Sequence, residues 1–129
     1  MKIDHTAIWV KNLEKMKDFY VKYFDVSAGP LYVNKMKAFS SYFLSFQDGS
    51  RLEIMSSPEV SRLNEQIYSR FTGYSHIAVS LGSRERVIEL TAAFAKEGIS
   101  IPDGPRTTGD GYFESVILDP EGNRIELTV

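Results

Sequence analysis

The chain has 129 residues, of which 43% are hydrophobic and 25% are charged, and its formal net charge is -2. This composition is typical of a globular protein and lacks the basic excess of nucleic-acid-binding proteins. No apolar run approaches the roughly 20 residues of a transmembrane helix, and the first ten residues do not resemble a secretory signal. We therefore expect a cytoplasmic protein that binds neither nucleic acid nor membranes. Because the chain has no cysteine, a metal site would use nitrogen and oxygen ligands.

The first half of the sequence predicts a β-α-β-β-β module. Apolar side chains alternate along the strands and recur at helical spacing after Asn12, which is a suitable N-cap. In the opening strand, the alternation places His5 and Trp9 on the face opposite to Ile8 and Val10. The expected elements are a strand over 3–10, a helix over 13–24, and strands over 31–34, 39–46 and 51–56.

The second half repeats this order after a polar connector, in which residues 60–68 could be helical. Ser83 is a suitable N-cap for the second helix, and Gly98 is placed to end it. A loop is expected over 106–111 and a turn over 119–123. The expected strands cover 75–81, 99–101, 112–118 and 124–129.

The sequence therefore predicts an internal duplication within one α+β domain over residues 1–129. The first module covers about 1–56, the connector about 57–72, and the second module about 73–129. In each module one helix can cover only one face of the sheet, so the other face must meet another sheet or line a cleft. Pairing of two copies would cover a concave face, and we expect a homodimer.

Four residues of metal-ligand type occur at repeated places. The two histidines of the chain, His5 and His76, lie in the first strand of each module, and Glu53 and Glu126 lie in the last strands. A lone residue of this kind is more often structural, but four at equivalent positions favour a metal site. Two imidazoles and two carboxylates form a neutral site with a divalent transition metal, and Zn, Ni, Co, Mn and Fe all fit this donor set.

These features resemble the vicinal oxygen chelate superfamily, and within it the glyoxalase I type, over nearly the whole chain. The resemblance rests on the strand with His5, on Leu52-Glu53-Ile54, on Ser75-His76-Ile77-Ala78-Val79, and on Asp119-Pro120-Glu121-Gly122-Asn123 leading to Glu126. It implies two βαβββ modules whose curved mixed sheets form a metal-bearing cleft, with the helices on the outer face. It also implies that His5, Glu53, His76 and Glu126 are the metal ligands.

The resemblance further implies that a metal-bound glutamate moves a proton between adjacent carbons of a small oxygenated substrate. Glu126 and Glu53 are both candidates for this catalytic base, and we favour Glu126. Glutathione-using members carry Arg four residues after the first histidine, where this chain has Trp9, which argues against glutathione. Trp9, Arg106 and Glu114 are the candidate substrate-binding residues, although the face of Glu114 depends on the hairpin register.

Two other functions also fit the sequence. An extradiol-type Fe(II) dioxygenase would use His5, His76 and Glu126, but the second carboxylate, Glu53, counts against that triad. A non-catalytic binding protein, like the drug-resistance members of the superfamily, would generally lack the metal residues that this chain contains. The main prediction is therefore a metal-dependent lyase or isomerase that acts on a small molecule.

Overall fold

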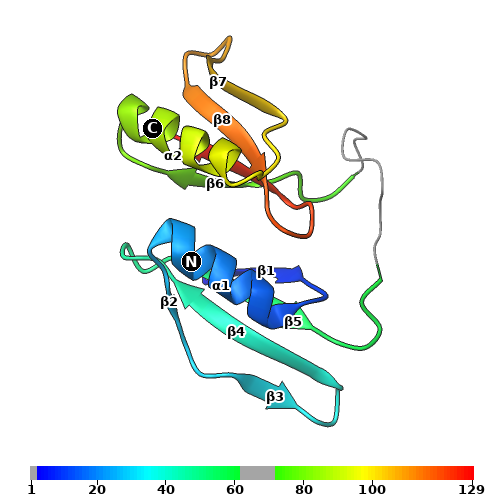
Figure 1. Ribbon diagram of the computed structural model, residues 1–129. Helices are drawn as coiled ribbons and strands as arrows, with labels where there is room; N and C mark the ends of the chain where they lie inside the picture. Colours follow the sequence, from blue (N-terminus) through cyan, green and yellow to red (C-terminus); the bar gives the residue numbers. More distant parts are fainter. Residues whose placement is uncertain (1–2, 62–71) are drawn as a thin grey trace. The chain divides into compact units, whose positions relative to one another are not determined.

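The computed structural model describes residues 3–61 and 72–129 (Figure 1). The chain divides into two compact units, Met1–Glu65 and Gln66–Val129, and the division falls inside the predicted connector. The helix considered for residues 60–68 falls almost entirely outside the described residues. That the two units form a single domain stays a prediction.

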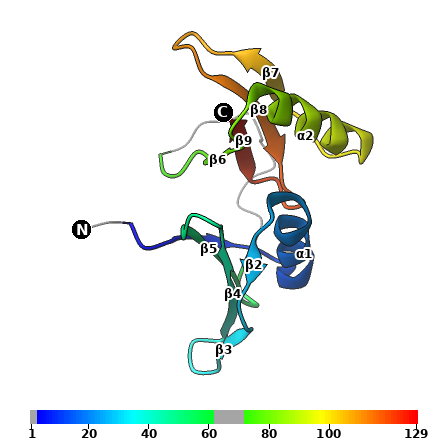
Figure 2. The same ribbon diagram turned by 90° about the vertical axis from the view of Figure 1, so that its left-hand side faces the viewer.

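In the first unit, one helix packs against one face of a five-stranded mixed sheet (Figures 1 and 2). The strand order is β1-β5-β4-β2, with β3 also paired to β4, and β1 runs parallel to β5. The elements are β1 (Thr6–Trp9), α1 (Leu13–Phe24), β2 (Ser27–Ala28), β3 (Tyr32–Asn34), β4 (Phe39–Ser45) and β5 (Arg51–Ser56).

The core of the first unit lies between α1 and the sheet. As predicted, Asn12 caps the helix, since its side chain accepts a hydrogen bond from the backbone N–H of Lys15. Leu52 and Ile54 point into the core, so Glu53 between them lies on the opposite face. The other buried apolar residues are Val10, Met16, Phe19, Tyr20, Phe24, Val26 and Leu44.

The second unit repeats this architecture with a four-stranded sheet in the order β6-β9-β8-β7, in which β6 runs parallel to β9. Ser83 caps the helix and Gly98, at a φ of 76°, follows its end, as predicted. Ile125 and Leu127 are fully buried and place Glu126 on the other face. The elements are β6 (Ile77–Ser80), α2 (Arg84–Lys96), β7 (Asp103–Thr107), β8 (Phe113–Leu118) and β9 (Arg124–Thr128).

Two local predictions are wrong. The short strand expected over 99–101 is absent, and β7 forms instead at Asp103–Thr107, so Arg106 lies in a strand rather than in a loop. This strand contains Pro105, which has no backbone N–H, and it is tolerated because β7 is the edge strand of its sheet. Among the described residues, no helix is long and apolar enough to span a membrane.

Aspartate-centred turns lead into the two strands that carry the glutamates. Before β9, the buried Asp119 carboxylate accepts hydrogen bonds from the backbone N–H groups of Glu121 and Asn123 and from the Asn123 side chain. Before β5, the exposed Asp48 carboxylate accepts from the backbone N–H and the hydroxyl of Ser50. These contacts fix where each last strand begins and therefore which side chains it turns away from the core.

Candidate metal centre

In the first unit, His5 and Glu53 approach each other from neighbouring strands. The residue opposite Glu53 in the parallel β1–β5 ladder is Ala7, which lies two positions after His5 and therefore on its face. Nε2 of His5 is 3.6 Å from Oε2 of Glu53. The two residues that the sequence pairs across 48 positions thus meet on the face of the sheet away from α1.

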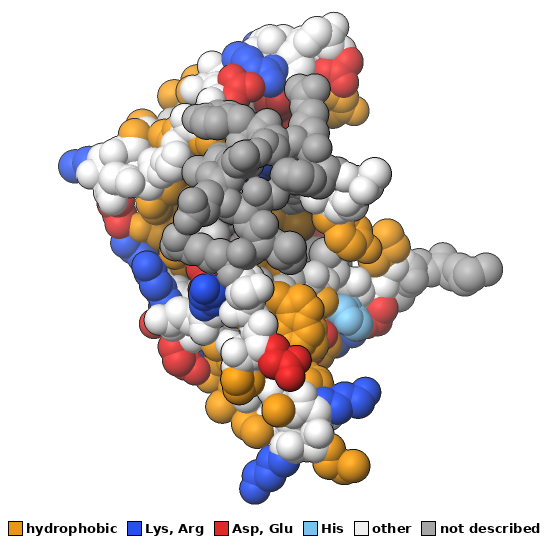
Figure 3. All heavy atoms as spheres, turned by 90° about the vertical axis from the view of Figure 1, so that its right-hand side faces the viewer, with side chains coloured by type: hydrophobic (Ala, Val, Ile, Leu, Met, Phe, Trp, Pro, Cys, Tyr) orange, Lys and Arg blue, Asp and Glu red, His pale blue; other side chains and the backbone are white. Residues whose placement is uncertain are grey.

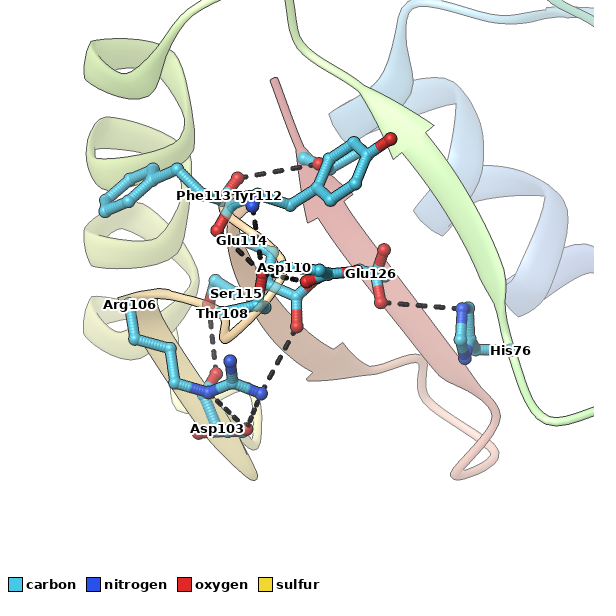
Figure 4. Close-up of polar contacts among 11 residues, drawn as sticks. His76, Asp103, Arg106, Thr108, Asp110, Tyr112, Phe113, Glu114, Ser115 and Glu126 are labelled. Atoms are coloured by element: carbon cyan, nitrogen blue, oxygen red, sulfur yellow. Dashed lines mark hydrogen bonds and ion pairs between the residues drawn. The ribbon is translucent and has the colours of Figure 1, made fainter.

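In the second unit, His76 and Glu126 form the same pair (Figure 4). Ala78, two positions after His76, lies opposite Glu126 in the parallel β6–β9 ladder. Nε2 of His76 is 3.5 Å from Oε2 of Glu126. The duplication predicted from the sequence therefore extends to the register and to the side-chain geometry of both pairs.

The separation within each pair suits two ligands of one metal ion. An N–H···O hydrogen bond joins atoms about 2.7–3.2 Å apart, whereas two ligand atoms each about 2.1 Å from a tetrahedral metal are about 3.4 Å apart. In neither unit do the described residues bring together three His, Asp or Glu side chains as a complete site. Each unit thus supplies two of the four predicted ligands, and their convergence on one metal stays a prediction.

The carboxylate of Asp4 contacts the ring nitrogen of His5 that does not face Glu53. Nδ1 of His5 lies 2.9 Å from Oδ2 of Asp4, so Nδ1–H can donate there while Nε2 keeps its lone pair toward Glu53. The pKa of Asp4 is lowered, first by this hydrogen bond and then by the positive charge of Arg51, which also contacts the carboxylate. The corresponding contact in the second unit is weaker, because Nδ1 of His76 lies 3.3 Å from the neutral hydroxyl of Ser75.

The sequence prediction missed Asp4. Adjacent residues in a strand point to opposite faces, so alternation would turn Asp4 away from His5. Both residues, however, precede β1, and there the Asp4 carboxylate reaches the His5 ring at 2.9 Å. The acidic residue directly before the candidate ligand was the one available signal, because metal-binding histidines commonly donate their other N–H to a carboxylate.

An aromatic ring lies beneath the same group. The His5 ring packs edge-on against Phe43, with 5.1 Å between the ring centroids. The guanidinium of Arg51 lies over the Phe43 ring at 4.7 Å. Phe43 is opposite Glu53 in the β4–β5 ladder, so one ring contacts both His5 and the arginine that neutralises Asp4.

Glu114 and Arg106 belong to a charged cluster beside the second pair (Figure 4). Val116 lies opposite Glu126, so Glu114, two positions earlier, shares the face of Glu126. The pKa of Glu114 is raised, first by burial and then by the negative charge of Glu126, while the charge of Arg106 acts against this. The hairpin register therefore places Glu114 on the face of Glu126, whereas the sequence alone left both faces open.

The guanidinium of Arg106 forms ion pairs with two carboxylates of its own unit, those of Asp103 and Glu114. One guanidinium nitrogen, Nη2, is 2.7 Å from Oδ2 of Asp103 and 3.2 Å from Oε1 of Glu114. Nε also donates to Asp103 at 2.8 Å. These contacts orient the guanidinium toward protein carboxylates, and its predicted binding of substrate stays a prediction.

Trp9 lies on the face that alternation predicts. Its side chain is 53% exposed, on the opposite face from the buried Val10 and on the same face as His5. Its ring packs edge-on against Phe39, with 6.3 Å between centroids. The structure thus places an exposed indole on the face of the first sheet that carries the His5–Glu53 pair.

A family model described as the glyoxalase/bleomycin resistance protein/dioxygenase superfamily matches residues 2–127. The chain belongs to this superfamily. The resemblance inferred from the sequence is confirmed, and so is the α+β fold with two βαβββ-like modules. Superfamily members bind small molecules, many are enzymes, and they are generally metal-dependent. A comparison with curated protein sequences finds no match.

Solved structures of superfamily proteins share the fold. A glyoxalase family protein from Enterococcus faecalis is 24% identical with a TM-score of 0.80, and the match covers 99% of this chain and 97% of that one. The trypanothione-dependent glyoxalase I of Leishmania major is 24% identical with a TM-score of 0.77, over 99% and 86% of the two chains. The fosfomycin resistance protein FosX of Listeria monocytogenes is 19% identical with a TM-score of 0.70, over 99% and 90%.

Proposed function

We propose that this superfamily member is a metal-dependent lyase or isomerase of the glyoxalase I type. The observation that best supports this function is the repeated His–Glu pair, with matching register and with Nε2–Oε2 separations of 3.6 and 3.5 Å. In this proposal, one divalent ion of Zn, Ni, Co, Mn or Fe is held by His5, Glu53, His76 and Glu126. The pairs come together either within one chain or across a homodimer.

The residues around the pairs fit this donor set. Both histidines turn Nε2 toward a carboxylate oxygen, and Asp4 holds His5 in the tautomer whose Nε2 can coordinate. When bound, the metal supplies positive charge at the substrate oxygen beside the carbon that loses its proton. We assign proton transfer to Glu126 rather than Glu53, and Glu114 lies on the same face of the second sheet as Glu126.

We propose a substrate other than a glutathione adduct. Trp9 stands where glutathione-using members have an arginine, and it presents an exposed apolar ring rather than a guanidinium to the ligand-bearing face. Glyoxalase I proteins of this fold differ in their thiol, since the Leishmania major enzyme is trypanothione-dependent. The alternative functions differ in the metal: the dioxygenase would require Fe(II) and oxygen, and the binding protein would require no metal at all.

The first test is metal uptake followed by turnover. Purified protein offered Ni, Co or Zn should retain one equivalent per set of four ligands, and Glu126→Gln and Glu53→Gln should bind it more weakly. Glu89→Gln is the matched control, because Glu89 is an exposed residue of α2. The loaded protein should exchange the carbon-bound proton of 2-oxoaldehyde adducts in a screen of several thiols. A protein that takes up no transition metal, or that exchanges no proton in any adduct, would overturn the proposal.

A further inference from the structure

The sheet face that carries the first His–Glu pair continues into a row of side chains from four strands. Met55 of β5 lies opposite Trp9 of β1 on one side and opposite Ser41 of β4 on the other. Ser41 in turn lies opposite Tyr32 of β3. Because residues opposite each other in a ladder point to the same face, these four side chains form one row across the sheet.

Aromatic rings dominate the exposed surface of this row. Phe39, two positions before Ser41 on the same strand, packs its ring against both Trp9 and Tyr32, with centroid distances of 6.3 and 5.8 Å. Trp9 and Tyr32 are 53% and 52% exposed, whereas Ser41 between them is fully buried. Phe39 therefore covers the position of Ser41 in the exposed surface, and we call Trp9, Phe39, Tyr32 and Met55 together the aromatic row.

The aromatic row begins next to the candidate metal ligands. Glu53 lies two positions before Met55 on the same face of β5, which separates their Cα atoms by about 7 Å. Phe43, which contacts the His5 ring, extends the apolar surface along β4. Figure 3 shows hydrophobic side chains directly beside a histidine on one face of the molecule. Apolar side chains therefore continue from the His–Glu pair into the row, and the Arg51 guanidinium lies over the Phe43 ring at the end beside the pair.

We propose that the aromatic row binds an aromatic group carried next to the oxygen-bearing carbons of the substrate. This inference rests on the proposed function and names its substrate class: aromatic 2-oxo or 2-hydroxy compounds and their thiol adducts. The spacing of about 7 Å between Glu53 and Met55 accommodates a ring joined directly to a metal-chelating oxygen pair. The row has no cation for the carboxylates of a peptide thiol, and its rings offer edge-to-face and stacked contacts to another ring.

The experiment compares two probes that share a metal-binding group and differ in one ring, benzohydroxamate and acetohydroxamate. On metal-loaded protein, we expect benzohydroxamate to bind about tenfold more tightly by calorimetry, since one ring contact contributes on this scale. Trp9 is the only tryptophan of the chain, so its fluorescence reports directly on the row. Benzohydroxamate should change this fluorescence, and acetohydroxamate should change it much less.

Substitutions in the aromatic row test whether its rings, rather than the metal site, cause the preference for benzohydroxamate. Trp9→Ala and Phe39→Ala should reduce the preference for benzohydroxamate to about threefold or less, while acetohydroxamate affinity stays unchanged. Trp9→Phe keeps a ring and should keep most of the preference. Tyr112→Ala is the matched control, because Tyr112 is an exposed aromatic residue of the second unit whose hydrogen bonds are made by its backbone.

The outcomes distinguish this inference from the proposed function. Equal affinities for the two probes, or a preference that survives in Trp9→Ala, would overturn the aromatic row as a binding site and leave the metal site intact. Loss of both probes from metal-loaded protein would overturn the proposed function and this inference together. A preference lost only in the row variants supports both.

Discussion

Nδ1 of His5 lies 2.9 Å from the carboxylate of Asp4, while Nε2 of the same ring lies toward Glu53. The hydrogen bond to Asp4 selects the tautomer with a free Nε2 and restrains rotation of the ring. In the metal proposal, Asp4 therefore orients the ligand His5 and is not itself one of the four ligands. Because His5 has a carboxylate partner at Nδ1 and His76 has only a hydroxyl, we expect the two histidines to contribute unequally to metal affinity.

The first prediction concerns this support. Asp4→Ala should weaken binding of Zn or Ni by about 10- to 100-fold, because such partners of ligand histidines have effects of this size. Ser75→Ala should have a smaller effect, since Ser75 is neutral and its hydroxyl lies 3.3 Å from Nδ1 of His76. The measurement is metal titration against a competing chelator. The control is Asp18→Ala on α1, and an Asp4→Ala affinity equal to that of the control would contradict the prediction.

The second prediction concerns Glu114 in metal-free protein. Its pKa is raised in the folded state, so the folded protein binds more protons than the unfolded chain above the ordinary carboxyl pKa. The free energy of unfolding therefore falls as pH rises through this window. Glu114→Gln removes the titration, so its stability relative to the wild type should increase from about pH 4 to about pH 7.

Urea unfolding at both pH values measures this difference. Above the pH range in which Glu114 titrates, loss of the contact with Arg106 lowers the stability of Glu114→Gln by a constant amount. The change of the stability difference with pH comes from the titration of Glu114 alone. Glu89→Gln on the exposed side of α2 serves as the control and should show a nearly constant difference. A constant difference for Glu114→Gln as well would show that its pKa is not raised.

The third prediction concerns the turn before β9. Asp119→Ala should lower the free energy of unfolding by about 2 kcal/mol or more, because it removes the buried carboxylate that accepts three part-buried hydrogen bonds. Asp48→Ala removes the matching residue of the first unit, which is exposed, and should cost less. Denaturant unfolding of both variants provides the comparison. Equal losses would mean that burial of the Asp119 carboxylate adds nothing to the stability of its turn.

The fourth prediction compares two fully buried serines. Among the described residues, the Ser41 hydroxyl has no hydrogen-bond partner, whereas the Ser115 hydroxyl donates to the carbonyl of Asp103 at 3.3 Å. Ser41→Ala removes an unpaired polar group, so it should leave stability unchanged or raise it by up to about 1 kcal/mol. Ser115→Ala should lower it by about 1 kcal/mol. Chemical unfolding would contradict this pairing if Ser41→Ala were the more destabilised variant.

Much of the fold was predictable because the two halves of the sequence repeat the same order of local signals. The alternation in the strands, the helix caps at Asn12 and Ser83, and the glycine after the second helix all act locally, and the structure confirms them. The failure at β7 has a different origin. The strand was predicted over 99–101 and the loop over 106–111, whereas β7 spans Asp103–Thr107. This edge strand can hold Pro105 because one side of it needs no donor.

The candidate site was predictable only where strand alternation controls side-chain direction. It correctly placed the two glutamates away from the core, because each is flanked by buried residues of its own strand. It missed the contact of Asp4 with His5, because Asp4 precedes β1, and it gave no information on Arg106, whose partners depend on the pairing of β7 with β8. The face of Glu114 likewise required the β8–β9 register, which one residue of slippage would reverse.

In both units the first strand pairs in parallel with the last, and each His–Glu pair joins residues 48 or 50 positions apart. The hairpins between them close over short distances, whereas these parallel ladders require the two ends of a unit to find each other. In a unit that has formed its hairpin but not this parallel ladder, the His–Glu pair has not yet come together. In the proposed metal site, binding would therefore require units whose parallel ladders have formed, and a bound ion would stabilise the folded units against unfolding.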